Sequence, residues 1–231
     1  FDFKKIMSRK KKVVRKLVLG VEASMKNHNV TVINGEATIK GRDEKGIEVI
    51  CNGESFLGKN LLICTGSEAS VPPIPGLKDA GEVVLTNREV LELKDLPESL
   101  VIIGGGVIGM EFASFFNSLG TKVTVVEMLP EILGGLDFEI SAMLREIYSK
   151  KGIEFHLNAK VVQVDANKVV FEKDNQKQSV EGEKILLSVG RKANMTGFGL
   201  ENINVETTRR GIVVNEKMQT NVPGVFAAGD V

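Results

Sequence analysis

The feature that most constrains the fold is a glycine-rich turn set between an apolar run and a helical pattern. The run Val101-Ile102-Ile103 is typical of a buried strand, and Gly104-Gly105-Gly106-Val107-Ile108-Gly109 follows it directly. Residues 109–113 then continue as an amphipathic helix. A Gly-x-Gly-x-x-Gly pattern is weak evidence alone, but a strand before it and a helix after it give it a mechanism. The segment therefore predicts the first strand-turn-helix of a dinucleotide-binding domain.

Each glycine of the pattern has a separate physical reason. Gly104 permits the tight turn, Gly106 lets the backbone approach a pyrophosphate, and Gly109 lets the helix sit close to the strand. The phosphates would then face the helix N-terminus, where free N–H groups and the helix dipole favour an anion. The candidate contacts in this turn are Gly104, Gly105, Gly106, Val107, Ile108 and Gly109.

An acidic residue at the end of the next strand specifies the nucleotide. The run 123–126 ends in Glu127, roughly 20 residues after the first glycine, where a carboxylate can accept hydrogen bonds from the adenosine ribose. A 2′-phosphate would be repelled there, and Met128, Leu129 and Pro130 supply no cation to bind it. The pattern predicts NAD rather than NADP. The alternative is a glycine turn and a surface glutamate in an α/β domain that binds no nucleotide.

Glu111, inside the predicted helix, has two interpretations. A negative charge near a helix N-terminus interacts favourably with the helix dipole, which would be a structural role. Its position beside the phosphate turn could equally bring it near the nicotinamide. The residues by themselves do not decide between the two.

The order of elements predicts an α/β fold with two lobes. Residues 3–27 have helical periodicity, and short β-like runs such as 30–33 and 60–64 follow them. Pro72, Pro73 and Pro75 mark a rigid connector to a second lobe in which strands and helices alternate. That alternation predicts a Rossmann-like parallel sheet with helices on both faces, to which an antiparallel β-meander is added.

Composition excludes several classes of function. Lys plus Arg and Asp plus Glu both number 30, so the attraction that drives binding to nucleic acids or anionic membranes is missing. No apolar run approaches the roughly 18 residues that span a bilayer, so we expect a cytoplasmic protein. Cys51 and Cys64 lack metal-ligand spacing, and both are expected to be small buried residues rather than redox groups. No metal site is predicted.

Several further segments resemble the pyridine nucleotide-disulfide oxidoreductase family. They extend over nearly the whole chain and are far more specific together than the glycine turn alone. They are Gly35-Glu36-Ala37, Thr65-Gly66-Ser67, Ile74-Pro75-Gly76, the run 103–127, Val189-Gly190-Arg191 and the run 220–231. Within the family, the class I members that oxidise dihydrolipoamide with NAD+ are the most similar.

The resemblance implies a discontinuous FAD domain, with residues 1–71 and 195–231 as its two partial segments and the NAD domain, residues 72–194, inserted between them. It implies that Glu111 lies near flavin and nicotinamide. It also assigns two groups of cofactor contacts. These are Gly190 and Val161 for NAD, and Gly35, Ala37, Thr65, Gly66 and Asp230 for FAD.

The chain also departs from the family pattern. It has no second Gly-x-Gly-x-x-Gly for the FAD pyrophosphate and no Cys-x4-Cys redox pair, and it ends just after Gly229-Asp230. His28 and His156 match no catalytic position and are expected to be structural or exposed. We therefore expect an internal fragment with no catalytic residue, inactive alone.

The parent enzyme implied by the resemblance is a homodimer and a possible component of a 2-oxo acid dehydrogenase complex. Its small-molecule partners would be NAD and FAD. The alternatives are another NADH-dependent flavin reductase, of the NADH oxidase or mercuric reductase type, and a non-catalytic module that binds only NAD.

Overall fold

The computed structural model describes residues 1–231, which form two compact units. The first unit comprises residues 1–16 and 69–190, and the second comprises residues 17–68 and 191–231. The chain therefore leaves the second unit, builds most of the first, and returns.

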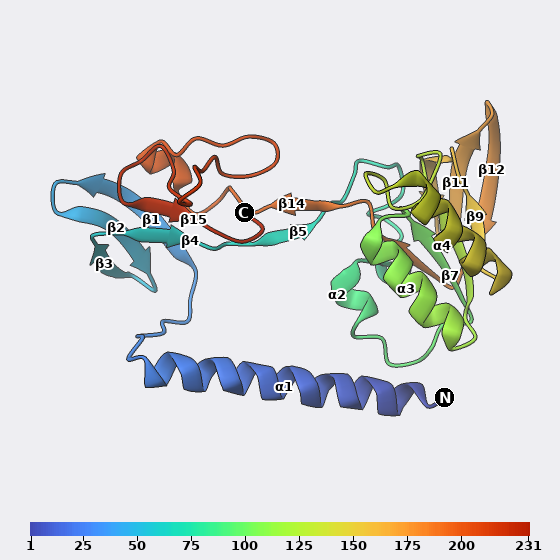
Figure 1. Ribbon diagram of the computed structural model, residues 1–231, viewed down its shortest axis with the longest axis horizontal. Coiled ribbons are helices and arrows are strands. Elements are labelled where there is room, and N and C mark those ends of the chain that lie inside the picture. The colour runs from blue at the N-terminus through green and yellow to red at the C-terminus, as the bar shows by residue number, and fades with distance from the viewer. The chain divides into compact units, whose positions relative to one another are not determined.

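Four α-helices and fifteen strands make up the chain (Figure 1). The helices are α1 (Phe3–Asn27), α2 (Asn87–Val90), α3 (Val107–Ser118) and α4 (Phe138–Lys150), with two short 3₁₀ helices, η1 (Gly81–Val83) and η2 (Leu200–Ile203). The strands are β1 (Ala37–Asp43), β2 (Gly46–Cys51), β3 (Glu54–Gly58), β4 (Leu61–Ile63), β5 (Ser67–Ala69), β6 (Val84–Leu85), β7 (Ser99–Ile103), β8 (Lys122–Val126), β9 (Glu154–His156), β10 (Lys160–Asp165), β11 (Lys168–Lys173), β12 (Gln176–Glu181), β13 (Lys184–Leu187), β14 (Arg191–Ala193) and β15 (Val225–Ala227).

The first unit is built on a five-stranded parallel sheet in the order β6-β13-β7-β8-β9. Four consecutive residues of β7, from Leu100 to Ile103, are almost completely buried because the sheet is covered on both faces. The helix α4 begins where the Asp137 side chain accepts hydrogen bonds from the N–H groups of Glu139 and Ile140. The parallel sheet and the helix α3 after the glycine turn are as the sequence predicts.

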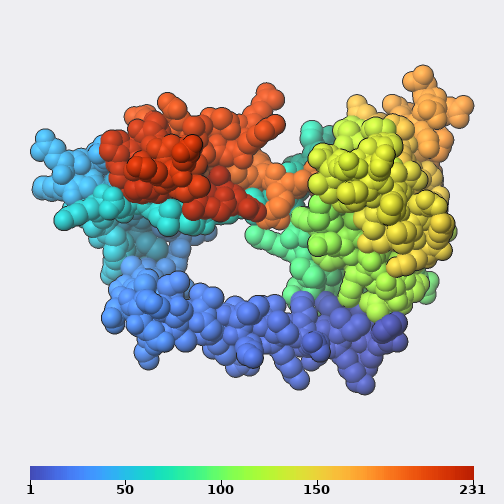
Figure 2. Space-filling view, in the orientation of Figure 1, coloured from blue at the N-terminus to red at the C-terminus, as the bar shows by residue number.

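The two faces of this sheet are covered by different kinds of structure. On one face, Leu100 and Ile102 pack with Met110 and Phe116 of α3, and Leu144 of α4 packs against the same cluster. The outer surface of α4 remains exposed (Figure 2).

The other face of the sheet carries no α-helix, so the prediction of helices on both faces is wrong. There Val101 and Ile103 pack against Val164, Val169 and Phe171 of the antiparallel sheet β10-β11-β12. The physical reason is that the crossover from β9 to β13 is made by this meander, whose alternate apolar residues bury the face that a helix would otherwise cover.

The second unit combines an antiparallel meander with a short parallel pair. Strands β1, β2 and β3 form a three-stranded sheet, while β4 pairs with β15 in parallel and β5 pairs with β14. Its core includes Ile39 and Ile47 from the meander, Ile63 from β4 and Val225 from β15. Residues widely separated in sequence therefore build one small core.

The helix α1 has the predicted length, but only its beginning is buried. Phe3 is a core residue of the first unit, whereas Val13, Val14, Leu17, Val18 and Val21 are each about half exposed. No helix is both long and apolar enough to cross a membrane.

Two smaller expectations are wrong. Residues 30–33 form no strand, because no neighbouring segment pairs with them. Cys64 is exposed, since it follows the last paired residue of β4, whereas Cys51 is buried as expected.

Gly76 provides a test of the packing between the connector and the meander. It has φ +77°, and a Cβ there would lie 1.8 Å from the carbonyl oxygen of Val164. We expect Gly76→Ala to lower the free energy of unfolding by roughly 3 kcal/mol, because backbone strain adds to the displacement of β10. Gly120→Ala is the matched control, since Gly120 has φ +99° but open space, and it should cost only about 1 kcal/mol. Equal losses in urea unfolding would contradict this account.

Candidate functional site

The glycine turn joins β7 to α3 with backbone atoms packed too closely for side chains. Gly104 has φ +105°, and a Cβ there would lie 2.4 Å from the carbonyl oxygen of Ser188. A Cβ on Gly109 would lie 2.4 Å from the carbonyl oxygen of Gly104 and 3.3 Å from Ile102 Cγ2. Glycine at these two positions is thus required by the fold of the unit itself.

Gly106 differs from Gly104 and Gly109, because nothing lies within 4 Å of the position its Cβ would occupy. It is the N-cap of α3, its backbone is extended, and no side chain caps the helix. The first hydrogen bond of the helix is donated by Met110 to Gly106, and the N–H groups of Val107, Ile108 and Gly109 have no partner within the chain. The open space at Gly106 and these free N–H donors form a cradle suited to an anionic group.

Glu127 lies beside the cradle and bridges two backbone segments. One carboxylate oxygen accepts a hydrogen bond from the N–H of Gly105, and the other accepts one from the N–H of Leu129 at 2.7 Å. The residue is only 9% exposed. A carboxylate has about four acceptor positions, so two remain for hydroxyl donors such as those of a ribose.

The segment after Glu127 is fixed against the turn and against α4. The N–H of Leu133 donates to the carbonyl oxygen of Gly105 at 2.8 Å, and Ile132 packs into the core below it. Glu131 is 6% exposed, and its two carboxylate oxygens share the single N–H of Arg145 Nε, at 2.8 and 3.0 Å. The same carboxylate accepts the N–H of Ile132 at 2.9 Å. Neither Glu131 nor Arg145 is predicted from the sequence, because nothing there pairs a loop glutamate with an arginine 14 positions away.

Two opposing effects act on the pKa of Glu131. Burial raises the pKa of this carboxyl, but the hydrogen bonds from Arg145 and from the N–H of Ile132, with the charge of Arg145, outweigh burial and leave the pKa below the ordinary 4.5. Arg145 responds in the opposite sense, because the Glu131 carboxylate raises the pKa of its guanidinium. The pair is therefore charged throughout the neutral range.

Other residues predicted to contact NAD lie at the same sheet edge or near it. Gly190 follows β13, has φ +114° and is open to solvent, and its carbonyl oxygen accepts the N–H of Ser70. Val161 lies in β10, where it is partly buried against the core. Glu111 is the fifth residue of α3; it is exposed and forms no ion pair. The structure leaves its two interpretations open.

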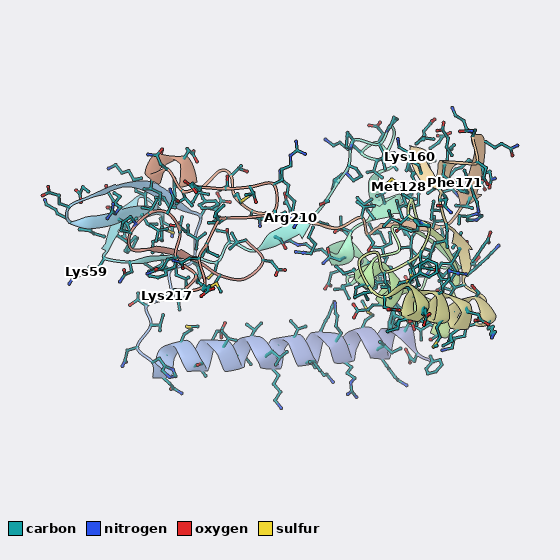
Figure 3. The ribbon with its side chains drawn as sticks, turned by 45° about the horizontal axis from the view of Figure 1, so that its top comes forward. Lys59, Met128, Lys160, Phe171, Arg210 and Lys217 are labelled. Carbon is teal, nitrogen blue, oxygen red and sulfur yellow. The ribbon has the colours of Figure 1, made fainter.

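Lys160 is a cation at the start of β10 that the sequence does not connect with Glu127. The N–H of Ala159 donates to the carbonyl oxygen of Glu127 at 2.9 Å, and Asn158 donates similarly to Leu129, so the start of β10 lies alongside Glu127–Leu129. Lys160 is exposed, forms no ion pair, and occupies the same region of the unit as Met128 (Figure 3). These tertiary hydrogen bonds place the backbone of Lys160 one residue from the segment that pairs with Glu127, and no spacing in the sequence predicts them.

The predicted FAD residues fall into two groups in the second unit. Because β4 and β15 are parallel, Thr65-Gly66 and Asp230 follow the carboxyl ends of neighbouring strands. Thr65 Oγ1 donates to the carbonyl oxygen of Asn194 at 2.8 Å, while Asp230 is exposed without a partner.

Gly35 and Ala37 precede and begin β1, which belongs to the separate three-stranded sheet. A Cβ on Gly35 would lie 2.4 Å from the side chain of Asn52. A side chain at this position would have to displace Asn52 and the buried Cys51, whose Sγ would lie 2.7 Å from the Cβ.

Neither histidine lies at a candidate catalytic position. His28 is exposed, and its ring nitrogen Nδ1 lies 2.8 Å from the carbonyl oxygen of Ser24. His156 ends β9, and its ring packs against Phe171 at a centroid distance of 4.9 Å.

Comparison with known proteins shows the family to which the chain belongs. The chain matches the pyridine nucleotide-disulphide oxidoreductase family over residues 2–231, and it belongs to that family. The dihydrolipoyl dehydrogenase of Acholeplasma laidlawii is 48% identical over the whole chain, and a dihydrolipoyl dehydrogenase of Bacillus subtilis is 38% identical. Among solved structures, the HOCl-induced flavoprotein disulfide reductase RclA of Escherichia coli matches with a TM-score of 0.88 at 29% identity, covering the whole chain.

The relatives are longer than this chain. It spans 68% of the Acholeplasma protein but only 51% of the Bacillus protein and 52% of the Escherichia coli structure. The expected family and the expected α/β class are thus confirmed.

The Glu131–Arg145 pair makes a pH-dependent prediction. At neutral pH, Glu131→Gln should lower the free energy of unfolding by about 1–3 kcal/mol, because it leaves the Arg145 charge without its partner. A carboxyl whose pKa is lowered by folding stabilises the fold above its unfolded pKa, and this contribution disappears as the pH falls through the folded pKa. The difference between wild type and variant should therefore shrink as the pH falls below 4.5.

Urea unfolding at a series of pH values measures this difference. Glu146→Gln is the control, because it disrupts an exposed pair with Lys150 on the same helix and should have no measurable effect. A difference between wild type and Glu131→Gln that stays constant down to pH 3 would contradict the assignment.

Proposed function

We propose that the first unit binds NAD(H) through the glycine turn 104–109 and Glu127, as part of a flavin-dependent dehydrogenase that oxidises dihydrolipoamide. The observation that carries the proposal is the cradle at Gly106. No atom of the chain lies within 4 Å of the position that a Cβ on Gly106 would occupy, and three N–H donors at the start of α3 have no acceptor. These are the features that a dinucleotide pyrophosphate requires.

Different residues of the first unit would contact different parts of the nucleotide. The N–H groups at the start of α3 would receive the pyrophosphate, and the Glu127 carboxylate would accept the ribose hydroxyls. Gly190 and Val161 complete the proposed NAD contacts, and Glu111 would lie toward the nicotinamide end. The bound nucleotide supplies hydride chemistry, while the protein binds and orients it.

The second unit fits FAD only in part. Thr65, Gly66 and Asp230 at the carboxyl ends of β4 and β15, with Gly35 and Ala37, are proposed contacts to the flavin cofactor. Within these 231 residues, no second helix begins at a glycine turn of this pattern to receive the FAD pyrophosphate. We therefore propose residues 1–71 and 195–231 as two segments of an FAD domain, and residues 72–194 as the NAD domain between them.

The activity of the whole protein rests on its relatives. Two relatives that match the entire chain are named dihydrolipoyl dehydrogenases, and the structural relative is named a flavoprotein disulfide reductase. On this basis we propose that the whole protein couples a dithiol substrate to NAD+ through FAD. A homodimer, and membership of a 2-oxo acid dehydrogenase complex, are proposed on the same grounds.

The choice between NAD and NADP can be tested through Glu127 and Lys160. We expect the chain to bind NADH more tightly than NADPH, because Glu127 repels a 2′-phosphate. Glu127→Ala should reduce the ratio of the NADPH to the NADH dissociation constant by about tenfold or more. It removes the repulsion and leaves the exposed Lys160 as a cation in the same region. Glu127→Ala combined with Lys160→Gln should lose part of that gain in NADPH affinity. Titration calorimetry of all three proteins with both nucleotides measures the six dissociation constants, and equal affinities in the unaltered chain would refute the assignment.

Gly106 provides a second test, in which binding and folding separate. Gly106→Ala should leave thermal stability nearly unchanged, because its Cβ meets no atom of the protein and its backbone is extended. It should weaken NADH binding by about tenfold or more, since the methyl group occupies the space proposed for the pyrophosphate. Gly20→Ala on α1, also in open space, is the control. Unchanged NADH affinity in Gly106→Ala would show that the pyrophosphate lies elsewhere.

A further inference from the structure

We propose that Glu131 and Arg145 are positioning residues for the nucleotide: their ion pair holds the segment 128–135 as a rigid wall beside the ribose-binding carboxylate. This inference rests on the proposed function and extends it to two residues that do not border the glycine turn in sequence. The wall follows Glu127 directly and leads to the N-cap of α4 at Asp137.

Hydrogen bonds tie the wall to the nucleotide cradle at two points. The N–H of Leu129 donates to Glu127, and the N–H of Leu133 donates to the carbonyl oxygen of Gly105. Glu127 in turn accepts the N–H of Gly105. Any displacement of the wall therefore changes the position of the carboxylate, of the turn, or of both.

The wall adopts a backbone conformation that is unfavourable by itself. Leu133 has φ +55°, a region that residues other than glycine rarely occupy, and it is followed by Gly134 and by Gly135 with φ +96°. Such a conformation persists only where the surrounding structure enforces it. Two adjacent glycines add flexibility, so the segment needs an external restraint to remain in one conformation.

The Glu131–Arg145 pair adds a polar restraint to the one that the buried side chains of Ile132 and Leu133 supply. Arg145 lies in the middle of α4, a helix that packs on the sheet through Leu144 and Tyr148. Its guanidinium contacts both oxygens of Glu131, whose side chain is only 7% exposed. The same carboxylate also accepts the N–H of Ile132, which adjoins Leu133. The pair thus links the segment 128–135 to the packed helix α4 and restricts the movement of this wall.

Exposed apolar side chains lie at the start of the wall. Met128 is 61% exposed and Leu129 is 44% exposed, directly after the carboxylate proposed to hold the ribose. An apolar surface next to the ribose is the chemistry that an adenine ring prefers. The pair would therefore control the adenosine half of the nucleotide rather than its nicotinamide half.

The test compares two variants that differ in stability but share the loss of the restraint. Arg145→Met removes the guanidinium and leaves a buried unpaired carboxylate, so it should destabilise the fold. Glu131→Gln combined with Arg145→Met removes both charges, so it should recover most of that stability. If the pair only stabilised the fold, NADH affinity would recover together with the melting temperature. A positioning role predicts that NADH affinity stays about tenfold weaker in both variants, the size expected when one or two side chains must be ordered on binding.

Amide hydrogen exchange of the full 231-residue chain supplies a direct readout of the wall. Exchange at the Leu133 N–H should accelerate about tenfold in both variants without nucleotide, and saturating NADH should slow it again. Lys150→Met is the matched control, because it removes the cation of an exposed ion pair from the same helix. It should alter neither the exchange nor the affinity.

The outcomes separate this inference from the proposed function. Failure of the unaltered chain to bind NADH would overturn the proposed function. Normal NADH binding by the unaltered chain and by both variants, or recovery of affinity in the double variant, would overturn the positioning role alone. Weakened affinity in both variants, with faster exchange at Leu133 and an unaffected Lys150→Met, would establish it.

Discussion

The candidate nucleotide site depends on the close contact between the glycine turn and the carboxyl end of β13. Gly104 can lie against the backbone of Ser188, and Gly109 against Gly104, only because none of these contacts has to accommodate a Cβ. This contact places the N-terminus of α3 over the edge of the sheet and leaves its first N–H groups free. Everything proposed for the nucleotide follows from that placement, because an anion is attracted to unpaired N–H donors at a helix N-terminus.

A second layer of interactions surrounds this contact. Glu127 joins the turn to the next segment, and Glu131 joins that segment to α4 through Arg145. Buried carboxylates are costly unless hydrogen bonds compensate for lost solvation, and both of these accept at least two. A site whose polar groups are already held in place loses less entropy when a ligand binds.

The two units differ in how completely they are built. The first unit has a five-stranded sheet covered on both faces, whereas the parallel pair of the second unit has only two strands. Leu62 of β4 and the apolar residues along the second half of α1 are largely exposed. The chain spans about half the length of the Bacillus relative and of the Escherichia coli structure, so the proposed dehydrogenase activity is assigned to the whole protein and the nucleotide site to this chain.

The sequence by itself determined the strand-turn-helix around Gly104, the acidic residue Glu127 at the end of the next strand, and the family. The first two features are local, because a glycine turn and an apolar run act within a few residues. Tertiary structure decided the rest. The meander covers the face where a helix was expected, since only long-range packing selects between two apolar partners for a sheet. The pairing of Ala159, the residue before Lys160, with Glu127 and the ion pair of Arg145 with Glu131 likewise depend on contacts between segments that no spacing in the sequence records.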